Sequence, residues 1–307
     1  MKIQFSYVNG KKTAYAILGS QSVSIVIEMG LLSCMGEWWH VAEWLSQQYG
    51  GVLLYERAGV NNSQTQTAKR TPRAIAEDLK ALLDTIPHES KLIFIAHSQG
   101  VLYVQQFTRL YPGMVKGMIL LDPLSADDNR FRQHLTMEEF KKSGVDKFKN
   151  LKPSYTIAKL HLGFIIKALM KGAPPFYYKK DFSQEAKKYI LDSFVKPAFY
   201  KTAMEEYSLS HEEAEITGLK TREGFPNIPL VLITHSSGVY EKEIIEFGGT
   251  TKELAHKIES IWQAIMKEYL TFSDTSKYME AKSSGHYIHL TEPGLLDKGI
   301  VWICENS

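Results

Sequence analysis

Residues 91–100 read Lys-Leu-Ile-Phe-Ile-Ala-His-Ser-Gln-Gly, and this stretch decides the fold. An apolar run, residues 92–96, leads directly into Ser98 and Gly100, and apolar side chains then recur at helical spacing over residues 101–111. The pattern predicts a buried strand that turns abruptly into an amphipathic helix, with Ser98 at the turn. Such a turn is a nucleophile elbow, which lifts a serine hydroxyl off the end of a sheet. Taken alone, the pattern also fits a serine that caps the following helix.

The residues around Ser98 favour the elbow. The positions two before and two after it are Ala96 and Gly100, and both side chains are small. Small residues are needed there because the strand and the helix nearly touch. The turn would also direct the first amides of the helix at the group that Ser98 attacks.

The bulk composition is that of an ordinary globular protein. The 307 residues are 44% hydrophobic and 23% charged, and a chain of this length can bury a large core. A net charge of +2, with lysines spread along the chain, gives no support to a nucleic-acid partner. No apolar segment is long enough for a membrane span or a signal peptide. Two cysteines, Cys34 and Cys304, make no disulfide framework and suit a reducing compartment, so we expect a cytoplasmic protein.

Strand and helix patterns alternate through the first 123 residues. A hairpin is expected over residues 3–18, with its turn at Asn9-Gly10. Buried strands are predicted at 22–28, 51–55 and 117–121 beside the strand before Ser98, and a helix is predicted at 72–86. Such alternation indicates crossover connections and a mainly parallel sheet.

The pattern changes between residues 124 and 227, where no buried strand is evident. Amphipathic stretches at 137–148, 155–170, 184–195 and 198–207 are separated by prolines. We predict a helical cap over 124–227, inserted between the two parts of an α/β core, 1–123 and 228–307. In the second part a strand is expected at 228–234, a long helix at 251–270 and a strand at 278–281.

Together these pieces resemble the α/β-hydrolase family over essentially the whole chain, and in particular its bacterial capped serine hydrolases. Four separated places carry the resemblance: the serine elbow, Glu28-Met29-Gly30, the loop at residues 55–63 and the ending Gly285-His286-Tyr287-Ile288-His289-Leu290. In the loop, Glu56 stands where the family usually has aspartate. The resemblance implies a twisted, mostly parallel eight-stranded sheet flanked by helices, with the cap inserted after strand 6. It also implies the chain order nucleophile, acid, histidine.

A serine is a weak nucleophile until a neighbouring imidazole takes its proton. Among the ten histidines, His286 has the right context, because it follows Gly285 on the loop after the last strand. We therefore predict that His286 is the general base. His97 is expected to pack beneath the elbow, and His289 to support the loop. Surface or core roles are expected of the other seven, His40, His88, His134, His161, His211, His235 and His256.

The position of the acid departs from the usual family pattern. Most relatives carry it after the strand at 228–234, where this chain has His235-Ser236-Ser237-Gly238 and no carboxylate. Some relatives carry it after the preceding strand, where Asp122 lies. We predict Asp122 as the acid that fixes the His286 tautomer and stabilises its imidazolium, although a carboxylate before Pro123 could also simply cap the turn. The other candidates are Glu241, Asp127 and Asp128.

An oxyanion hole needs two amides that point at the developing negative charge. By position, these are the backbone N–H groups of Leu31 and Gln99. A carboxylate at Glu28 would not help such a site, and we expect it to form a structural pair with Arg57.

The sequence predicts a serine hydrolase that cleaves a carboxylic ester, or a thioester, lactone or amide, through an acyl-enzyme on Ser98. Its substrate would be a small acyl compound, and neither a cofactor nor a metal is implied. Ser98 argues against the dehalogenase and epoxide-hydrolase branches, whose nucleophile is an aspartate. The alternatives are a non-catalytic ligand receptor and an aminopeptidase. Carboxylates available to hold a substrate amine in the latter are Glu205, Glu206, Glu212 and Glu213.

Aromatic side chains of the predicted cap have two interpretations. They could line an apolar acyl site, or they could pack the helices of the cap against one another. They are Phe176, Tyr177, Tyr178, Phe182, Phe199, Tyr200 and Tyr207.

Overall fold

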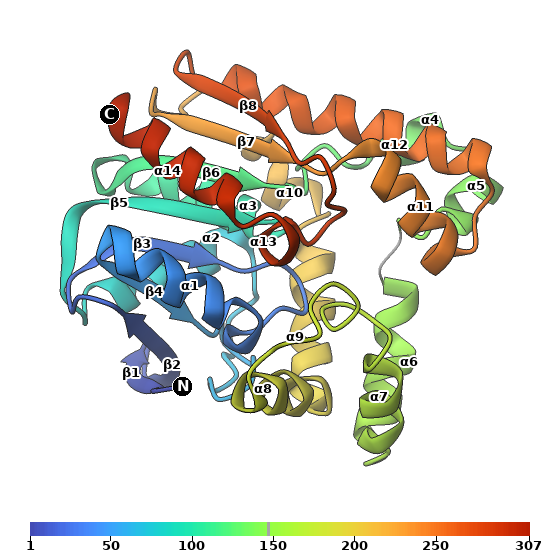
Figure 1. Ribbon diagram of the computed structural model, residues 1–307, viewed down its shortest axis with the longest axis horizontal. Helices are drawn as coiled ribbons and strands as arrows, with labels where there is room; N and C mark the ends of the chain where they lie inside the picture. Colours follow the sequence, from blue (N-terminus) through green and yellow to red (C-terminus); the bar gives the residue numbers. More distant parts are fainter. Residues whose placement is uncertain (146–147) are drawn as a thin grey trace.

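The computed structural model describes residues 1–145 and 148–307, and its centre is one eight-stranded sheet (Figure 1). The strand order is β1-β2-β4-β3-β5-β6-β7-β8. The first two pairings, β1 with β2 and β2 with β4, are antiparallel, and all the others are parallel. The predicted mostly parallel sheet is therefore confirmed. The strands are β1 (Gln4–Val8), β2 (Lys11–Leu18), β3 (Val23–Glu28), β4 (Gly51–Tyr55), β5 (His88–His97), β6 (Val115–Leu121), β7 (Leu230–Thr234) and β8 (Ser276–Glu280).

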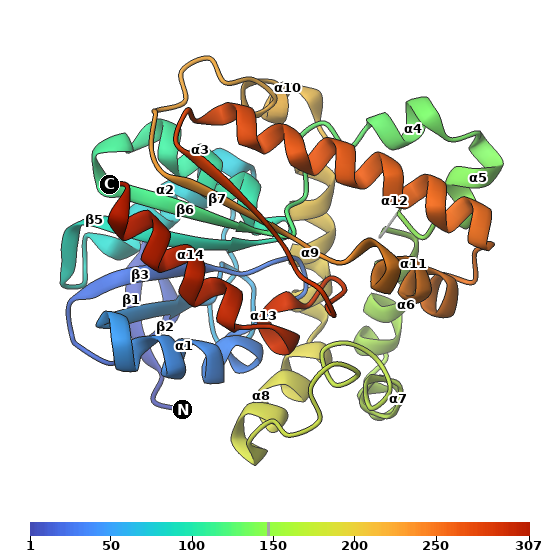
Figure 2. The same ribbon diagram turned by 45° about the horizontal axis from the view of Figure 1, so that its top comes forward.

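Helices cover both faces of this sheet (Figures 1 and 2). On one face lie α1 (Met35–Tyr49), α13 (Ile288–Thr291) and α14 (Gly294–Glu305). On the other lie α2 (Pro72–Leu83) and α3 (Gly100–Leu110). Because successive strand residues point to opposite faces, a strand covered on both sides must be apolar at every position. This is why the central strands read as continuous apolar runs.

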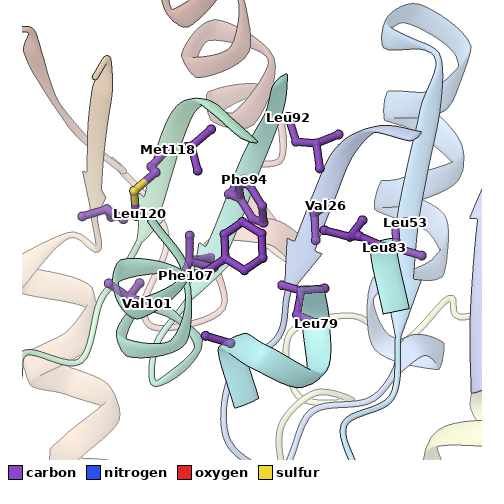
Figure 3. Close-up of a cluster of buried hydrophobic side chains, with 14 of the residues drawn as sticks. Val26, Leu53, Leu79, Leu83, Leu92, Phe94, Val101, Phe107, Met118 and Leu120 are labelled. Atoms are coloured by element: carbon purple, nitrogen blue, oxygen red, sulfur yellow. The ribbon is translucent and has the colours of Figure 1, made fainter. Parts of the chain in front are cut away.

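Figure 3 shows a cluster of buried hydrophobic side chains between the sheet and the helices α2 and α3. Val26, Phe94 and Leu120 come from three neighbouring strands and are fully or almost fully buried. Phe107 of α3 packs on Phe94, with 4.9 Å between the ring centroids. The helix after the elbow is thus held to the sheet by the apolar face that its sequence period predicts.

The segment between β6 and β7 contains helices and turns but no strand within its described residues, 124–145 and 148–227. Helices α6 to α9 lie beyond the carboxyl ends of β3, β5 and β6, while α4 and α5 lie beside α12 (Lys252–Lys267) (Figures 1 and 2). The predicted stretch at 137–148 is helical over Met137–Lys142, and its residues 146 and 147 lie outside the described residues. The helices are α4 (Arg130–His134), α5 (Met137–Lys142), α6 (Phe148–Lys159), α7 (Gly163–Met170), α8 (Gln184–Phe194), α9 (Pro197–Leu209) and α10 (Glu213–Ile216).

One helix has no counterpart among the elements that the sequence predicts. The place after β7, where most relatives would carry the acid on a turn, begins the helix α11 (Ser237–Gly248), which packs on α12 (Lys252–Lys267). Short 3₁₀ helices occupy Pro112–Met114, Thr217–Leu219 and Glu268–Phe272. Among the described residues, no helix combines the length and the apolar character that crossing a bilayer requires.

Candidate active site

Ser98 occupies a strained turn between β5 and α3. Its φ is +54°, a left-handed backbone conformation that non-glycine residues seldom adopt. The turn is held by the end of β6, because the Ser98 amide donates to the Leu121 carbonyl (3.0 Å) and the Ser98 carbonyl accepts from the Leu124 amide (3.0 Å). A Cβ at Gly100 would lie 2.7 Å from the Glu28 carbonyl oxygen. The helix is therefore so close to β3 that only glycine fits at this position.

His286 lies on the loop between β8 and α13, with its side chain 22% exposed. Its Nδ1 is 2.6 Å from Oδ2 of Asp122. Its carbonyl accepts a hydrogen bond from Nε2 of His97 (3.0 Å), whose ring lies 4.7 Å from the His286 ring, centroid to centroid. Within residues 1–145 and 148–307 the Ser98 hydroxyl has no hydrogen bond, as is common for a nucleophile and its base before substrate binds.

Asp122 directly follows β6, is completely buried and also has a positive φ, +47°. Oδ2 faces His286, and Oδ1 accepts from both the amide (3.1 Å) and Nδ1 (2.6 Å) of His235. Burial alone would raise the pKa of Asp122, but the charge and hydrogen bonds of His235, together with His286, hold its pKa well below the usual range. Asp122 is therefore an ionised acceptor. It keeps a proton on Nδ1 of His286 and leaves Nε2 free to act as a base.

His235 is the first residue after β7, and its side chain is fully buried between two carboxylates. Its Nε2 lies 2.8 Å from Oε2 of Glu259 on α12. Since both ring nitrogens face carboxylate oxygens, both carry protons and the ring is an imidazolium. Burial opposes this charge, but Asp122 and Glu259 outweigh it and raise the pKa of His235 to about 10.

The contact between His235 and Asp122 is not among the contacts that the sequence predicts, since only a surface or core role is expected of His235. One signal could have found it. His235 follows β7, at the sheet edge where most relatives carry the acid, so a side chain there reaches the neighbouring end of β6.

The other candidate acids contact different partners. Glu241 accepts from Nδ1 of His256 (2.8 Å), and Asp128 from Nε2 of His211 (2.6 Å). Asp127 pairs with Arg130 (2.8 Å). Of the four carboxylates considered, only Asp122 contacts His286 in the described part of the chain.

Two further carboxylates hold the loop that carries His286. Glu37 of α1 contacts Nε2 of His289 (2.9 Å), whose ring stacks on Trp38 at a centroid distance of 3.8 Å. His289 thus anchors the loop to α1. On the other side, Glu243 of α11 lies directly against Gly285, where an added Cβ would be 1.9 Å from its Oε2. A side chain before His286 would therefore have to displace this buried carboxylate.

The turn after β3 lies against Ser98. A Cβ at Gly30 would be 3.1 Å from the Ser98 Cβ and 3.1 Å from Nδ1 of His97. The amides of Leu31 and Gln99, which are predicted to form the oxyanion hole, donate no hydrogen bond to any group in residues 1–145 and 148–307. Both are free to bind an anion beside the serine.

Beside this turn, Arg57 contacts Glu28 as expected, with Nη1 2.8 Å from Oε1. It also binds Glu206 of α9 through Nε (3.0 Å) and Nη2 (3.0 Å). Glu206 is buried, so it is not a free carboxylate for a substrate amine. Glu205 accepts from the Arg70 amide (3.1 Å), and Glu213 pairs with Lys220 on the surface (2.7 Å).

Comparison with known proteins gives one family and many similar structures. The family model described as serine aminopeptidase, S33, matches residues 20–207. The uncharacterized protein YqjL of Bacillus subtilis is 22% identical over 286 residues, which are 92% of this chain and 85% of YqjL. Among solved structures, the epoxide hydrolase CorEH superposes with a TM-score of 0.68 at 16% identity over 99% of each chain. Est816, described as an N-acyl homoserine lactone degrading enzyme, superposes with a TM-score of 0.62 at 15% identity over 97% of this chain and 99% of its own chain.

Proposed function

Since the chain belongs to the α/β-hydrolase family described as serine aminopeptidase, S33, we propose that it is a serine hydrolase that cleaves a carboxylic ester or a related acyl bond. One observation carries the proposal. The elbow at Ser98 and the 2.6 Å contact between His286 Nδ1 and Asp122 Oδ2 occur at the same edge of the sheet. An oriented imidazole beside a raised serine is what acyl transfer needs.

In the proposed mechanism the Ser98 hydroxyl attacks the acyl carbon while His286 Nε2 takes its proton. The resulting oxyanion binds the amides of Leu31 and Gln99, and Asp122 stabilises the imidazolium. His286 then protonates the leaving group, which departs and leaves an acyl-enzyme. A water molecule that gives its proton to His286 attacks this ester, and the carboxylic acid is released as Ser98 regains its proton.

The proposal does not extend to epoxides, although an epoxide hydrolase is among the similar structures. A carboxylate nucleophile opens an epoxide to an alkyl ester, which water can hydrolyse. A serine would form an ether instead, and an ether has no carbonyl for water to attack. The serine at the elbow therefore favours acyl substrates.

An aminopeptidase is the second candidate, because the family description names that activity. Such an enzyme needs a carboxylate free to bind the amine of its substrate. Three of the four candidate carboxylates, Glu205, Glu206 and Glu213, already have partners. Glu212 is exposed and has no hydrogen bond or ion pair of its carboxylate within residues 1–145 and 148–307. The balance favours an acyl substrate without an amine. Comparing an aminoacyl anilide with the matching N-acetylated compound separates the two, since an aminopeptidase loses activity when the amine is blocked.

A fluorophosphonate reagent tests the proposal directly, because it reacts with an activated serine. We expect labelling of the wild type and hydrolysis of p-nitrophenyl butyrate, and loss of both in Ser98→Ala and His286→Ala. Ser208→Ala, on the exposed side of α9, is the matched control and should label normally. Absence of labelling in the wild type would favour a non-catalytic receptor, and equal labelling of Ser98→Ala would show that the reactive nucleophile is another residue. Either result contradicts the proposal. A small acyl substrate and a cytoplasmic location stay predictions, and the two free cysteines are in keeping with the latter.

A further inference from the structure

The guanidinium of Arg57 uses all five of its N–H groups on buried acceptors. Nε binds Glu206, and Nη2 binds Glu206 and the Gly30 carbonyl, each at 3.0 Å. Nη1 binds Glu28 at 2.8 Å and the Met29 carbonyl at 2.6 Å. A guanidinium has five donors in a rigid planar fork, so its orientation is completely determined by these partners.

The side chains in this cluster are almost inaccessible, with exposed fractions of 4% for Arg57, 0% for Glu28 and 1% for Glu206. Burying three ionisable side chains is costly, and an apolar cluster of the same shape is often at least as stable. The ion pairs by themselves therefore do not explain why the cluster exists. The two backbone carbonyls that Arg57 also binds indicate a functional role for the cluster, because both belong to the turn beside Ser98.

These two hydrogen bonds determine where the amides of the turn point. In a trans peptide the C=O and N–H groups point in opposite directions. The Met29 and Gly30 carbonyls both point at Arg57, so the N–H groups of Gly30 and Leu31 point away from it. Ser98 closely approaches Gly30, as the 3.1 Å between its Cβ and an added Gly30 Cβ shows. A guanidinium on one side of the turn thus holds the Leu31 amide toward the other side.

We propose that Arg57 is a positioning residue that orients the Leu31 amide for the oxyanion, and that Glu206 holds Arg57 in this orientation. The inference rests on the proposed function, since it assumes an oxyanion at Ser98. Glu206 belongs to α9 in the segment between β6 and β7, whereas the other four groups belong to the sheet and its loops. The position of α9 is therefore coupled to the geometry of the Leu31 amide through the Glu206 side chain.

The neighbouring residue supplies a matched control. Glu205 lies on the same helix and also contacts the core, through the Arg70 amide (3.1 Å), but it does not touch Arg57. Glu205→Gln and Glu206→Gln thus make the same chemical change one residue apart. Only Glu206→Gln replaces a negatively charged hydrogen-bond partner of the Arg57 guanidinium with a neutral one.

Two measurements on full-length enzyme test the coupling. The first is kcat and KM for p-nitrophenyl butyrate. The second is the inhibition constant of a trifluoromethyl ketone, whose tetrahedral adduct carries an oxyanion. We expect Glu206→Gln to lower kcat by about 10- to 100-fold with little change in KM, since losing one oxyanion donor outright costs about 10²- to 10³-fold. The inhibition constant of the ketone should rise by a similar factor, while Glu205→Gln stays within about twofold of the wild type in both.

Active sites are counted by fluorophosphonate titration, so a variant that folds poorly is corrected for its inactive fraction. Arg57→Lys provides a second variant, because it keeps the charge but loses the planar fork. It should also raise the inhibition constant of the ketone by a larger factor than KM for the ester. Equal effects of Glu205→Gln and Glu206→Gln per active site, or a change in KM alone, would overturn the inference. If instead Ser98→Ala is as active as the wild type, the proposed function fails and the inference fails with it.

Discussion

His235 Nδ1 lies 2.6 Å from Oδ1 of Asp122, the carboxylate oxygen that His286 does not use. One buried aspartate is thus held between two imidazoles, and a second carboxylate, Glu259, lies behind the outer one. This arrangement determines which oxygen of Asp122 is available to His286. It also places a positive charge beside the aspartate in the buried interior.

The charge on His235 should make stability depend on pH. In the fold its pKa is about 10, against 6.5 for an ordinary histidine, so unfolding between these values releases a proton. Its contribution to stability is therefore complete below about pH 6.5 and is lost as pH rises toward 10. We expect the difference in free energy of unfolding between the wild type and His235→Gln, measured by urea denaturation, to shrink over this range. Glu259→Gln should move the decline to lower pH, and a pH-independent difference would contradict the prediction.

Asp122→Asn should lower kcat by about 10⁴-fold, because an amide in this position favours the wrong tautomer of the base. Hydrolysis of p-nitrophenyl butyrate measures the effect. Glu241→Gln is the comparison and should leave kcat unchanged, since within residues 1–145 and 148–307 Glu241 hydrogen-bonds to the exposed His256 and not to His286. The reverse pattern, a large loss in Glu241→Gln and a small one in Asp122→Asn, would show that the acid is misassigned.

Gly285→Ala should damage the loop that carries His286. The new methyl group would overlap the Glu243 carboxylate, and overpacking of this kind costs about 1–3 kcal/mol. We expect a lower melting temperature and lower kcat. Gly285→Ala combined with Glu243→Ala should lose less than the sum of the single effects, because the second change opens the space. Gly238→Ala on α11 meets no atom within 4 Å and should be tolerated.

The two cysteines should react differently. Cys304 is exposed, whereas Cys34 is buried and its burial raises the pKa of its thiol. Native protein should therefore take up one equivalent of a thiol reagent quickly, and the second only after denaturation. Cys304→Ser should remove the fast equivalent. Two fast equivalents would show that the region around Cys34 opens in solution.

The features that the sequence determined by itself are local ones. The apolar run before Ser98, the helical period after it and the small residues Ala96 and Gly100 predict the elbow without any distant contact. The Gly285-His286 pair is equally local. Such patterns are readable because strand and helix periods, and the space that a turn allows, depend on residues close together in the chain.

The partners of these residues were decided by tertiary structure. Asp122 and His286 are 164 positions apart, and Arg57 and Glu206 are 149 apart. Sequence reasoning narrowed the acid to four carboxylates but had no means to see His235 or Glu259 behind it. The sequence also predicts no helix over Ser237–Gly248, where α11 brings Glu243 against Gly285. The physical reason is that a buried charge is stable only beside a specific partner. The identity of that partner depends on which strand ends and helices lie next to each other in the fold. A local sequence period does not contain this information.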